Sequence, residues 1–175
     1  MSDKAISGEA VSGSREEPEN RVGSTASAGT NASPPLSRPV LGASIAVFRE
    51  GQVLLAQRGK APGLGLYSLP GGRVEAGETM REGALRELRE EVGLEAEIVG
   101  FIDHVEHIDR TEDGTVRAHA VVAAFAGHWR GGEGILTDEA TDLVWVDPFN
   151  PGNRPMTRGL AAILARAARI MEEQG

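Results

Sequence analysis

The stretch Gly72–Leu94, GRVEAGETMREGALRELREEVGL, decides the fold of this 175-residue chain. Thr79 and Glu82 have the spacing of a capping box, in which each side chain binds the other residue's backbone N–H, so a helix is predicted to begin there. Gly93 is suited to a left-handed cap and marks the predicted end of the helix. Between these ends a single apolar stripe recurs at intervals of three and four, formed by Ala84, Leu85, Leu88 and Val92.

The side opposite this stripe is predicted to carry a group of three carboxylates, Glu87, Glu90 and Glu91. Like charges at this spacing destabilise a helix by roughly a few tenths of a kcal/mol per pair. One interpretation is a solvent-exposed face with scattered ion pairs, because Arg86 and Arg89 flank the group. The other is a binding site for one or two divalent cations, because Mg²⁺ and Mn²⁺ prefer hard oxygen ligands.

The wider spacing favours the metal site. From Gly72 to Leu94 the chain reads Gly, five residues, Glu, seven residues, then Arg-Glu-Leu-any-Glu-Glu-any-Gly-Leu. This pattern resembles the Nudix box of the Nudix hydrolases, and every specified position of that box is filled. The resemblance extends more loosely over residues 40–150. It implies an α/β fold, the Nudix-type α/β/α sandwich with a mixed sheet, in which a loop–helix–loop metal site cleaves nucleoside diphosphates linked to another group.

The resemblance also implies roles for individual residues. Mg²⁺ or Mn²⁺ would be held by Glu87, Glu90 and Glu91 and by the backbone carbonyl of Gly71. Bound metal would bridge phosphate oxygens and activate water for attack on a pyrophosphate bond. Glu90 is the third ligand candidate and a candidate catalytic residue; the alternative is that it is a solvated neighbour of the metal ligands.

Four other residues of the motif are expected to be structural. Arg86 is expected to orient a carboxylate, because its planar guanidinium can hold one bidentately. Glu78 lies just before the helix and is expected to pair, with Arg86 as its candidate partner. Gly72 is expected to lie in the tight turn of Pro70-Gly71-Gly72, and Gly93 in the helix cap.

The general base is expected outside the helix. Glu139 lies six residues before Trp145 in a polar, glycine-containing segment, residues 127–142. Some Nudix enzymes carry an additional catalytic or metal-binding glutamate at a similar place, so Glu139 is the candidate catalytic residue. Glu133, in a Gly-Gly-Glu-Gly setting, is its rival, and either could instead be an ordinary exposed acid.

Substrate contacts are expected near the second strand. Arg58 and Lys60 follow that strand and are candidates for binding phosphate, although ordinary surface charge is an equal alternative for Lys60. Three aromatic residues are candidates for stacking on a base, or alternatively belong to the core: Tyr67, Phe101 and Trp129. His104 and His107 are interpreted as ordinary polar residues at a strand end, because no third histidine or cysteine partner accompanies them.

Composition divides the chain into two parts. Residues 1–38 are rich in Ser, Gly, Ala, Pro and Glu and contain no aromatic residue, so they are predicted to be a disordered tail. Residues 39–175 are predicted to form one domain. Strands are expected at 40–48, 53–57, 67–69, 96–104, 116–125 and 143–146, and a second helix is expected after Pro155.

Charge and residue usage exclude several classes of function. The formal net charge of -8 argues against binding of long nucleic acid, the chain has no cysteine, and no apolar run is long enough for a membrane span. A cytoplasmic enzyme with a small-molecule nucleotide substrate is expected, and a homodimer is left open. A non-catalytic, nucleotide-sensing Nudix module is disfavoured because such proteins usually lose box carboxylates.

The substrate is the least determined feature. The segment leading into the box and the short stretch before Leu143–Asp147 resemble small bacterial ADP-ribose pyrophosphatases, so ADP-ribose or a related dinucleotide is predicted. The alternative is sanitation of oxidised nucleoside triphosphates such as 8-oxo-dGTP. Such a substrate requires a pocket that reads the altered base edge, for which Asn150 and Asn153 are candidates.

Overall fold

The computed structural model of the chain describes residues 38–174. The predicted tail lies outside this range apart from its last residue. The described chain forms one mixed sheet and two helices, in the order β1 (Val40–Arg49), β2 (Gln52–Arg58), β3 (Tyr67–Ser68), β4 (Gly71–Arg73), α1 (Met80–Val92), β5 (Glu95–Arg110), β6 (Val116–Gly131), β7 (Ala140–Val146) and α2 (Leu160–Gln174).

The sheet is built around β1. Its strands follow the order β3-β2-β1-β6-β5, with β4 paired to β1 and β7 paired to β2. The predicted hairpin of β1 and β2 is confirmed, and Phe48 lies opposite Val53. The β1–β6 pair is parallel, whereas β5 and β6 form a long antiparallel pair. The mixed sheet predicted from the sequence is therefore present.

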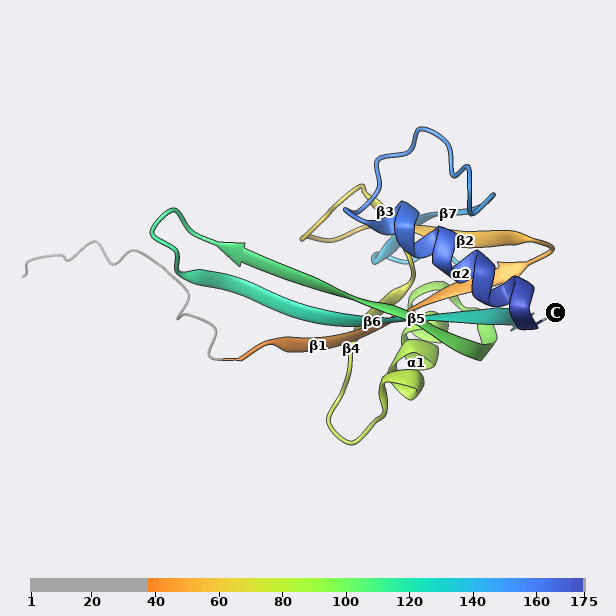
Figure 1. Ribbon diagram of the computed structural model, residues 1–175, viewed down its shortest axis with the longest axis horizontal. Helices are drawn as coiled ribbons and strands as arrows, with labels where there is room; N and C mark the ends of the chain where they lie inside the picture. Colours follow the sequence, from red (N-terminus) through yellow and green to blue (C-terminus); the bar gives the residue numbers. More distant parts are fainter. Residues whose placement is uncertain (1–37, 175) are drawn as a thin grey trace, which may run out of the picture. The chain divides into compact units, whose positions relative to one another are not determined.

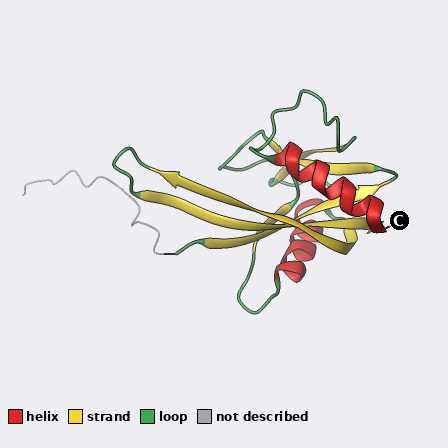
Figure 2. Cartoon of the chain, viewed as in Figure 1, coloured by secondary structure: helices red, strands yellow, loops and turns green. Residues whose placement is uncertain are grey.

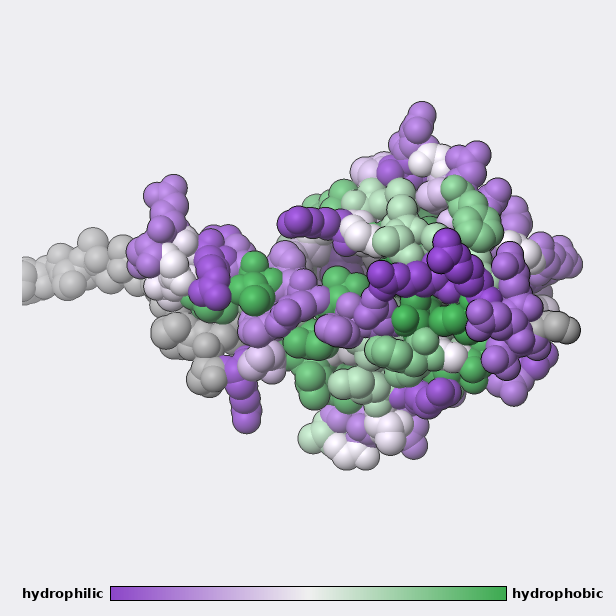
Figure 3. Space-filling model, in the orientation of Figure 1, coloured by the Kyte–Doolittle hydropathy of each residue, from purple (hydrophilic) through white to green (hydrophobic). Residues whose placement is uncertain are grey.

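The two helices cover opposite faces of this sheet (Figures 1 and 2). Strand β1 shows how one sequence serves both layers, because its side chains alternate between the faces. Ile45 and Val47 pack with Leu88 of α1, whereas Ala46 and Phe48 belong to the cluster that contains α2. This arrangement confirms the α/β/α sandwich. On the face shown in Figure 3, apolar residues gather around α2 and hydrophilic residues dominate the margins.

The segment before α1 differs from its prediction. Residues 71–73 do not simply turn into the helix but form β4, which pairs antiparallel with Gly42–Ser44 of β1. Glycine permits this close pairing: a Cβ at Gly71, where φ is 155°, would lie 2.3 Å from the carbonyl oxygen of Ala43. The start of the Gly72–Leu94 motif is thereby fixed to the central strand of the sheet.

Strands β5 and β6 are longer than their hydrophobic patterns predict, because polar residues continue the pairing. Arg117 donates to Asp109 at 2.7 Å and His119 lies 2.9 Å from Glu106 across the pair. His104 and His107 therefore lie within β5 rather than at a strand end. Since β6 continues to Gly131 and β7 begins at Ala140, the predicted loop at 127–142 shrinks to residues 132–139.

Within residues 38–174, neither helix has the length and apolar character that a membrane crossing requires.

Candidate metal and substrate site on helix α1

Helix α1 begins and ends where local sequence signals predict. The Thr79 hydroxyl accepts a hydrogen bond from the Glu82 backbone N–H at 3.2 Å, and the Glu82 carboxylate accepts one from the Thr79 N–H at 2.7 Å. Gly93 has the left-handed φ of 67° and donates its N–H to the Arg89 carbonyl. The capping box and the glycine cap are both confirmed, and they fix which helical positions face the sheet.

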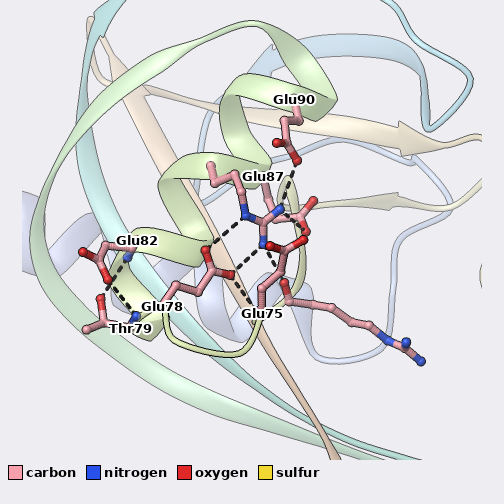
Figure 4. Close-up of polar contacts among 8 residues, drawn as sticks. Glu75, Glu78, Thr79, Glu82, Glu87 and Glu90 are labelled. Carbon is pink, nitrogen blue, oxygen red and sulfur yellow. Dashed lines mark hydrogen bonds and ion pairs between the residues drawn. The ribbon is translucent and has the colours of Figure 1, made fainter.

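Arg86 pairs with three acidic side chains, those of Glu78, Glu87 and Glu90, which are labelled in Figure 4. It donates to both carboxylate oxygens of Glu78, at 2.7 and 3.1 Å, which confirms the expected pairing. It also donates to Glu87 at 2.9 Å and to Glu90 at 3.0 Å. The Arg86 guanidinium holds the pKa of Glu78 below its usual value, and its contacts to Glu87 and Glu90 place one positive charge among the three side chains.

Glu91 has a different environment. Its side chain is only 7% exposed, and it lies on the buried side of α1 with Leu88 and Val92. One carboxylate oxygen accepts a hydrogen bond from the Gly71 N–H at 2.9 Å. Burial raises the pKa of Glu91 to about 7, and the hydrogen bond from Gly71 opposes this shift only in part.

The prediction that Glu91 lies opposite the apolar stripe is therefore wrong. Position 91 is three residues after Leu88, and it turns toward β4 at the edge of the buried face rather than toward solvent. Leu85, which the pattern assigned to the stripe, is only partly buried. The spacing of apolar residues predicts which side of the helix is buried. Which residues are buried in fact depends on how α1 packs against the strands of the sheet.

Gly72 provides the space for the second acidic side chain. A Cβ at this position would lie 2.5 Å from the carboxylate of Glu87, so a larger residue would displace that carboxylate from its place beside β4. Gly71 and Gly72 thus lie against Glu91 and Glu87 respectively. The Gly71 N–H is used by Glu91, which is a structural role beyond the carbonyl ligand that the resemblance implies.

The donor set fits a hard divalent cation, although it is not assembled around one. Among residues 38–174, no three His, Cys, Asp or Glu side chains are grouped closely enough to hold an ion. Arg86 binds Glu87 at 2.9 Å and Glu90 at 3.0 Å, so both carboxylates are engaged with this guanidinium. Carboxylate oxygens are nevertheless the ligands that Mg²⁺ prefers, and no basic side chain in the described part of the chain is paired with the buried Glu91.

Two residues from other elements act electrostatically on Glu91. Arg58, at the end of β2, lowers the pKa of Glu91, whereas Glu139 and Glu87 raise it. Glu139 lies in the segment between β6 and β7, and its side chain is 53% exposed. The folded chain therefore brings Arg58 and Glu139 close enough to Glu91 for their charges to act on its carboxyl group.

Lys60 is placed differently from a free phosphate-binding lysine. Its ammonium group lies 2.8 Å from Asp138 and 2.8 Å from Glu139. The two carboxylates raise the pKa of Lys60, and Lys60 lowers the pKa of Asp138. Asp138 was not predicted as a site residue, because only the folded chain brings it next to Lys60.

Tyr67 is not available to stack on a base. Its side chain is 9% exposed and belongs to the core cluster beneath α2. Its hydroxyl donates to Asp142 at 2.5 Å, and the Arg154 guanidinium lies 5.9 Å from the ring centroid. The structure gives Tyr67 a packing role, which corrects its assignment as a substrate-binding residue. Asp142 was not predicted, because nothing in its local sequence indicates a partner in β3.

The remaining candidates have local contacts or exposed side chains. Arg58 donates locally to the Pro62 carbonyl at 2.8 Å. The Trp129 indole donates to the Gly132 carbonyl, and the Arg49 guanidinium covers its ring at 4.5 Å. Phe101 lies on β5 with 52% of its surface exposed, and Glu133 is exposed in the segment after β6.

Comparison with known proteins agrees with this geometry. The model of the NUDIX domain family matches residues 38–165. A putative 8-oxo-dGTP diphosphatase 2 of Mycobacterium tuberculosis is 36% identical over 132 residues, which cover 69% of this chain and 84% of that protein. An ADP-ribose pyrophosphatase of Methanocaldococcus jannaschii is 32% identical over 104 residues, which cover 59% of each chain.

Solved structures show the same fold. A MutT NUDIX hydrolase from Burkholderia pseudomallei superposes with a TM-score of 0.65 at 29% identity, covering 74% of this chain and 98% of that one. A mixed sheet between two helices, with an acidic helix docked on a glycine-rich strand, defines the class of fold. The chain belongs to the NUDIX domain family, and it is an enzyme of the Nudix pyrophosphohydrolase type.

Proposed function

We propose that this protein hydrolyses a pyrophosphate bond in a nucleoside diphosphate derivative with the help of Mg²⁺ or Mn²⁺. The observation that carries the proposal is the buried carboxylate of Glu91, which accepts a hydrogen bond from the Gly71 N–H and whose pKa is raised to about 7 by burial. A buried acid of this kind costs stability unless a cation compensates its charge. Nudix hydrolases generally use divalent metal ions, and such an ion would supply that compensation.

The proposed metal ligands are Glu87, Glu91 and the Gly71 carbonyl, with Glu90 as a further candidate. Bound metal would supply charge neutralisation on the phosphate oxygens and an acidified water molecule. Gly71 fixes the Glu91 carboxylate through its N–H, and Arg86 holds Glu87 and Glu90 near the same end of α1. Arg58 is positively charged and acts on Glu91, so it is proposed to bind a substrate phosphate.

Glu139 is proposed as the catalytic residue that orients or deprotonates the attacking water. Two features support this choice over Glu133. The Glu139 charge acts on Glu91, and its carboxylate is held by Lys60 at 2.8 Å rather than moving freely in solvent. General acid–base catalysis by a positioned carboxylate typically contributes about 10²- to 10⁴-fold to the rate.

The reaction is tested by incubating the full chain with nucleoside diphosphate derivatives and Mg²⁺ or Mn²⁺. For ADP-ribose, cleavage of the pyrophosphate bond yields AMP and ribose 5-phosphate, which can be separated by anion-exchange chromatography. Glu139→Gln and Glu133→Gln are compared under the same conditions, and only Glu139→Gln is expected to lose turnover. Tight nucleotide binding without cleavage of any compound would contradict the proposed reaction.

ADP-ribose or a related dinucleotide is the substrate class proposed from the sequence pattern. It is supported by the similarity to the Methanocaldococcus jannaschii protein that bears the name ADP-ribose pyrophosphatase. The aromatic stack once expected for adenine cannot be Tyr67, so Trp129 and Phe101 are the aromatic candidates that remain. This substrate requires the diphosphate to lie at Glu87 and Glu91 with a sugar on either side.

The second candidate is a nucleoside triphosphate with an oxidised base. It is supported by the similarity to the mycobacterial protein named a putative 8-oxo-dGTP diphosphatase, which aligns over a larger share of its length. Asn153 is exposed in the segment after β7, and this segment is anchored to β3 because the Tyr67 N–H donates to the Pro155 carbonyl at 2.8 Å. An exposed amide at an anchored position is suited to reading a base edge.

The ratio of kcat/KM for ADP-ribose and 8-oxo-dGTP at matched metal concentration decides between the two substrates. A preference of more than about tenfold corresponds to ~1.4 kcal/mol of differential transition-state binding and identifies the favoured class. If the oxidised nucleotide is favoured, Asn153→Ala and Asn150→Ala are compared, and the variant that reduces this preference identifies the residue that reads the base edge.

A further inference from the structure

The segment that carries Glu139 is fastened to the C-terminal end of helix α1. The Ile135 N–H donates to the Val92 carbonyl at 2.9 Å, and the Thr137 hydroxyl donates to the Glu91 carbonyl at 3.0 Å. The backbones also approach closely, since a Cβ at Gly132 would lie 2.2 Å from the Gly93 carbonyl oxygen. Residues 132–139 therefore form a strap across the helix end rather than a loop directed into solvent.

Within this strap, the Thr137 side chain uses its full hydrogen-bonding capacity. A hydroxyl has one donor and two acceptor positions. The Thr137 hydroxyl donates to the Glu91 carbonyl and accepts from the backbone N–H groups of Glu139, at 3.2 Å, and Ala140, at 3.1 Å. A single oxygen atom thus joins the backbone of Glu91 to the backbone of Glu139.

The other side of the strap is held by the segment after β2. The Gly59 N–H donates to the Glu139 carbonyl at 2.8 Å, and a Cβ at Gly59 would lie 2.0 Å from the Asp138 carbonyl oxygen. This contact fixes the strap to the sheet, but it makes no connection to α1. Thr137 is the side chain through which the strap is hydrogen-bonded to the metal-ligand end of the helix.

We propose that Thr137 is a positioning residue that sets the Glu139 carboxylate relative to Glu91. The inference rests on the proposed catalytic role of Glu139. It adds the residue that holds the Glu139 backbone in position. Glu139 has a half-exposed side chain on a segment without regular structure, so its backbone must be fixed for its carboxylate to be useful. Thr137 provides that restraint by binding the backbone carbonyl of Glu91, the residue whose carboxylate is proposed to bind metal.

The test compares Thr137→Val with Thr137→Ser and with Thr141→Val. Valine keeps the shape but leaves three backbone groups without their partner, whereas serine keeps the hydroxyl. Thr141 is a matched control, because its hydroxyl contacts Gln57 and neither Glu91 nor Glu139. Steady-state kinetics with the better of ADP-ribose and 8-oxo-dGTP are measured well below the unfolding midpoint of every variant.

Thr137→Val is expected to lower kcat by about 10- to 100-fold with KM changed less than about twofold, because a displaced catalytic group affects the transition state more than binding. Thr137→Ser and Thr141→Val are expected to keep a kcat near that of the wild type. Thr137→Ala is measured in parallel, so that a folded variant without the hydroxyl is tested even where valine prevents folding. A wild-type kcat for a folded variant without the hydroxyl overturns the inference.

A double-mutant cycle with Glu139→Gln separates this inference from the role of Glu139. Thr137→Val is expected to cause no further loss of kcat in the Glu139→Gln background, because Thr137 acts through Glu139. An equal loss in both backgrounds overturns the positioning role but leaves Glu139 as a catalytic residue. A wild-type kcat for Glu139→Gln alone overturns the catalytic role of Glu139, and the positioning role falls with it.

Discussion

The acidic residues in and just before helix α1 have two contrasting environments. Glu78, Glu87 and Glu90 all bind Arg86, and the last of these is 61% exposed. Glu91 is 7% exposed and accepts one backbone hydrogen bond, and no basic side chain among residues 38–174 forms an ion pair with it. The pKa of Glu78 lies below its usual value, whereas burial raises the pKa of Glu91 to about 7.

The carboxylates paired with Arg86 are therefore expected to stabilise the folded state, whereas the buried Glu91 carboxylate is expected to destabilise it. A compensated ion-pair group supports the turn into the helix, and Glu78 also accepts a hydrogen bond from the Glu75 N–H at 2.7 Å. A buried acid without a cation lowers stability, and such groups concentrate at functional sites. The same Glu→Gln substitution is therefore expected to have opposite effects on the two sides of α1.

Glu91→Gln is expected to produce the largest effect. Glutamine keeps the size of the side chain and an oxygen that can accept from the Gly71 N–H, but it removes the charge that a metal requires. We expect kcat to fall by about 100-fold or more, equivalent to ~2.7 kcal/mol, while Tm at pH 8 in EDTA stays equal or rises. Steady-state kinetics and thermal unfolding of the same preparation measure both; wild-type turnover at saturating substrate would remove Glu91 from the metal site.

The second largest effect is expected in the pH dependence of the metal-free protein. The Glu91 carboxyl has a pKa of about 7 in the fold and 4.5 as its reference value, so the folded state binds more protons between these values. Stability should therefore fall as the pH rises from about 5 to 8, by an amount of order 3 kcal/mol. Urea unfolding in EDTA measures the slope, and Glu91→Gln should flatten it; an unchanged slope in this variant would assign the effect to another group.

Glu78→Gln is expected to act on stability more than on catalysis. The substitution removes half of the bidentate pair with Arg86 at the start of the motif. Tm should fall by a few degrees, whereas kcat of the folded fraction should stay close to that of the wild type. Thermal unfolding gives Tm, and kinetics at low temperature give kcat. A loss of kcat as large as for Glu91→Gln would contradict the structural role assigned to Glu78.

The smallest effect is expected at the capping box. Thr79→Ala removes one side of the reciprocal cap and should cost about 1 kcal/mol of unfolding free energy. Turnover should be unchanged, because Thr79 lies at the opposite end of α1 from Glu91. Thr79→Ser is the matched control and should restore the stability measured by urea unfolding.

The sequence by itself determined the features that depend on neighbouring residues. The limits of α1 follow from Thr79, Glu82 and Gly93, because caps form between residues three or four positions apart. The hairpin of β1 and β2 and the alternation along β1 follow from local pattern in the same way. The family, and with it the fold, follows from the spacing between Gly72 and Leu94.

Only the tertiary structure decided which acidic residue is buried and what surrounds it. Glu91 turns inward because the Gly71 N–H, 20 residues away, lies beside it, and the arc of α1 that faces the sheet depends on β4. Tyr67 belongs to the core because α2 and Asp142 cover it, and Thr137 meets the Glu91 carbonyl across 46 residues. These contacts join segments that no local pattern relates, since pairing of distant strands and helices is selected by packing of the whole domain rather than by the residues on either side of each partner.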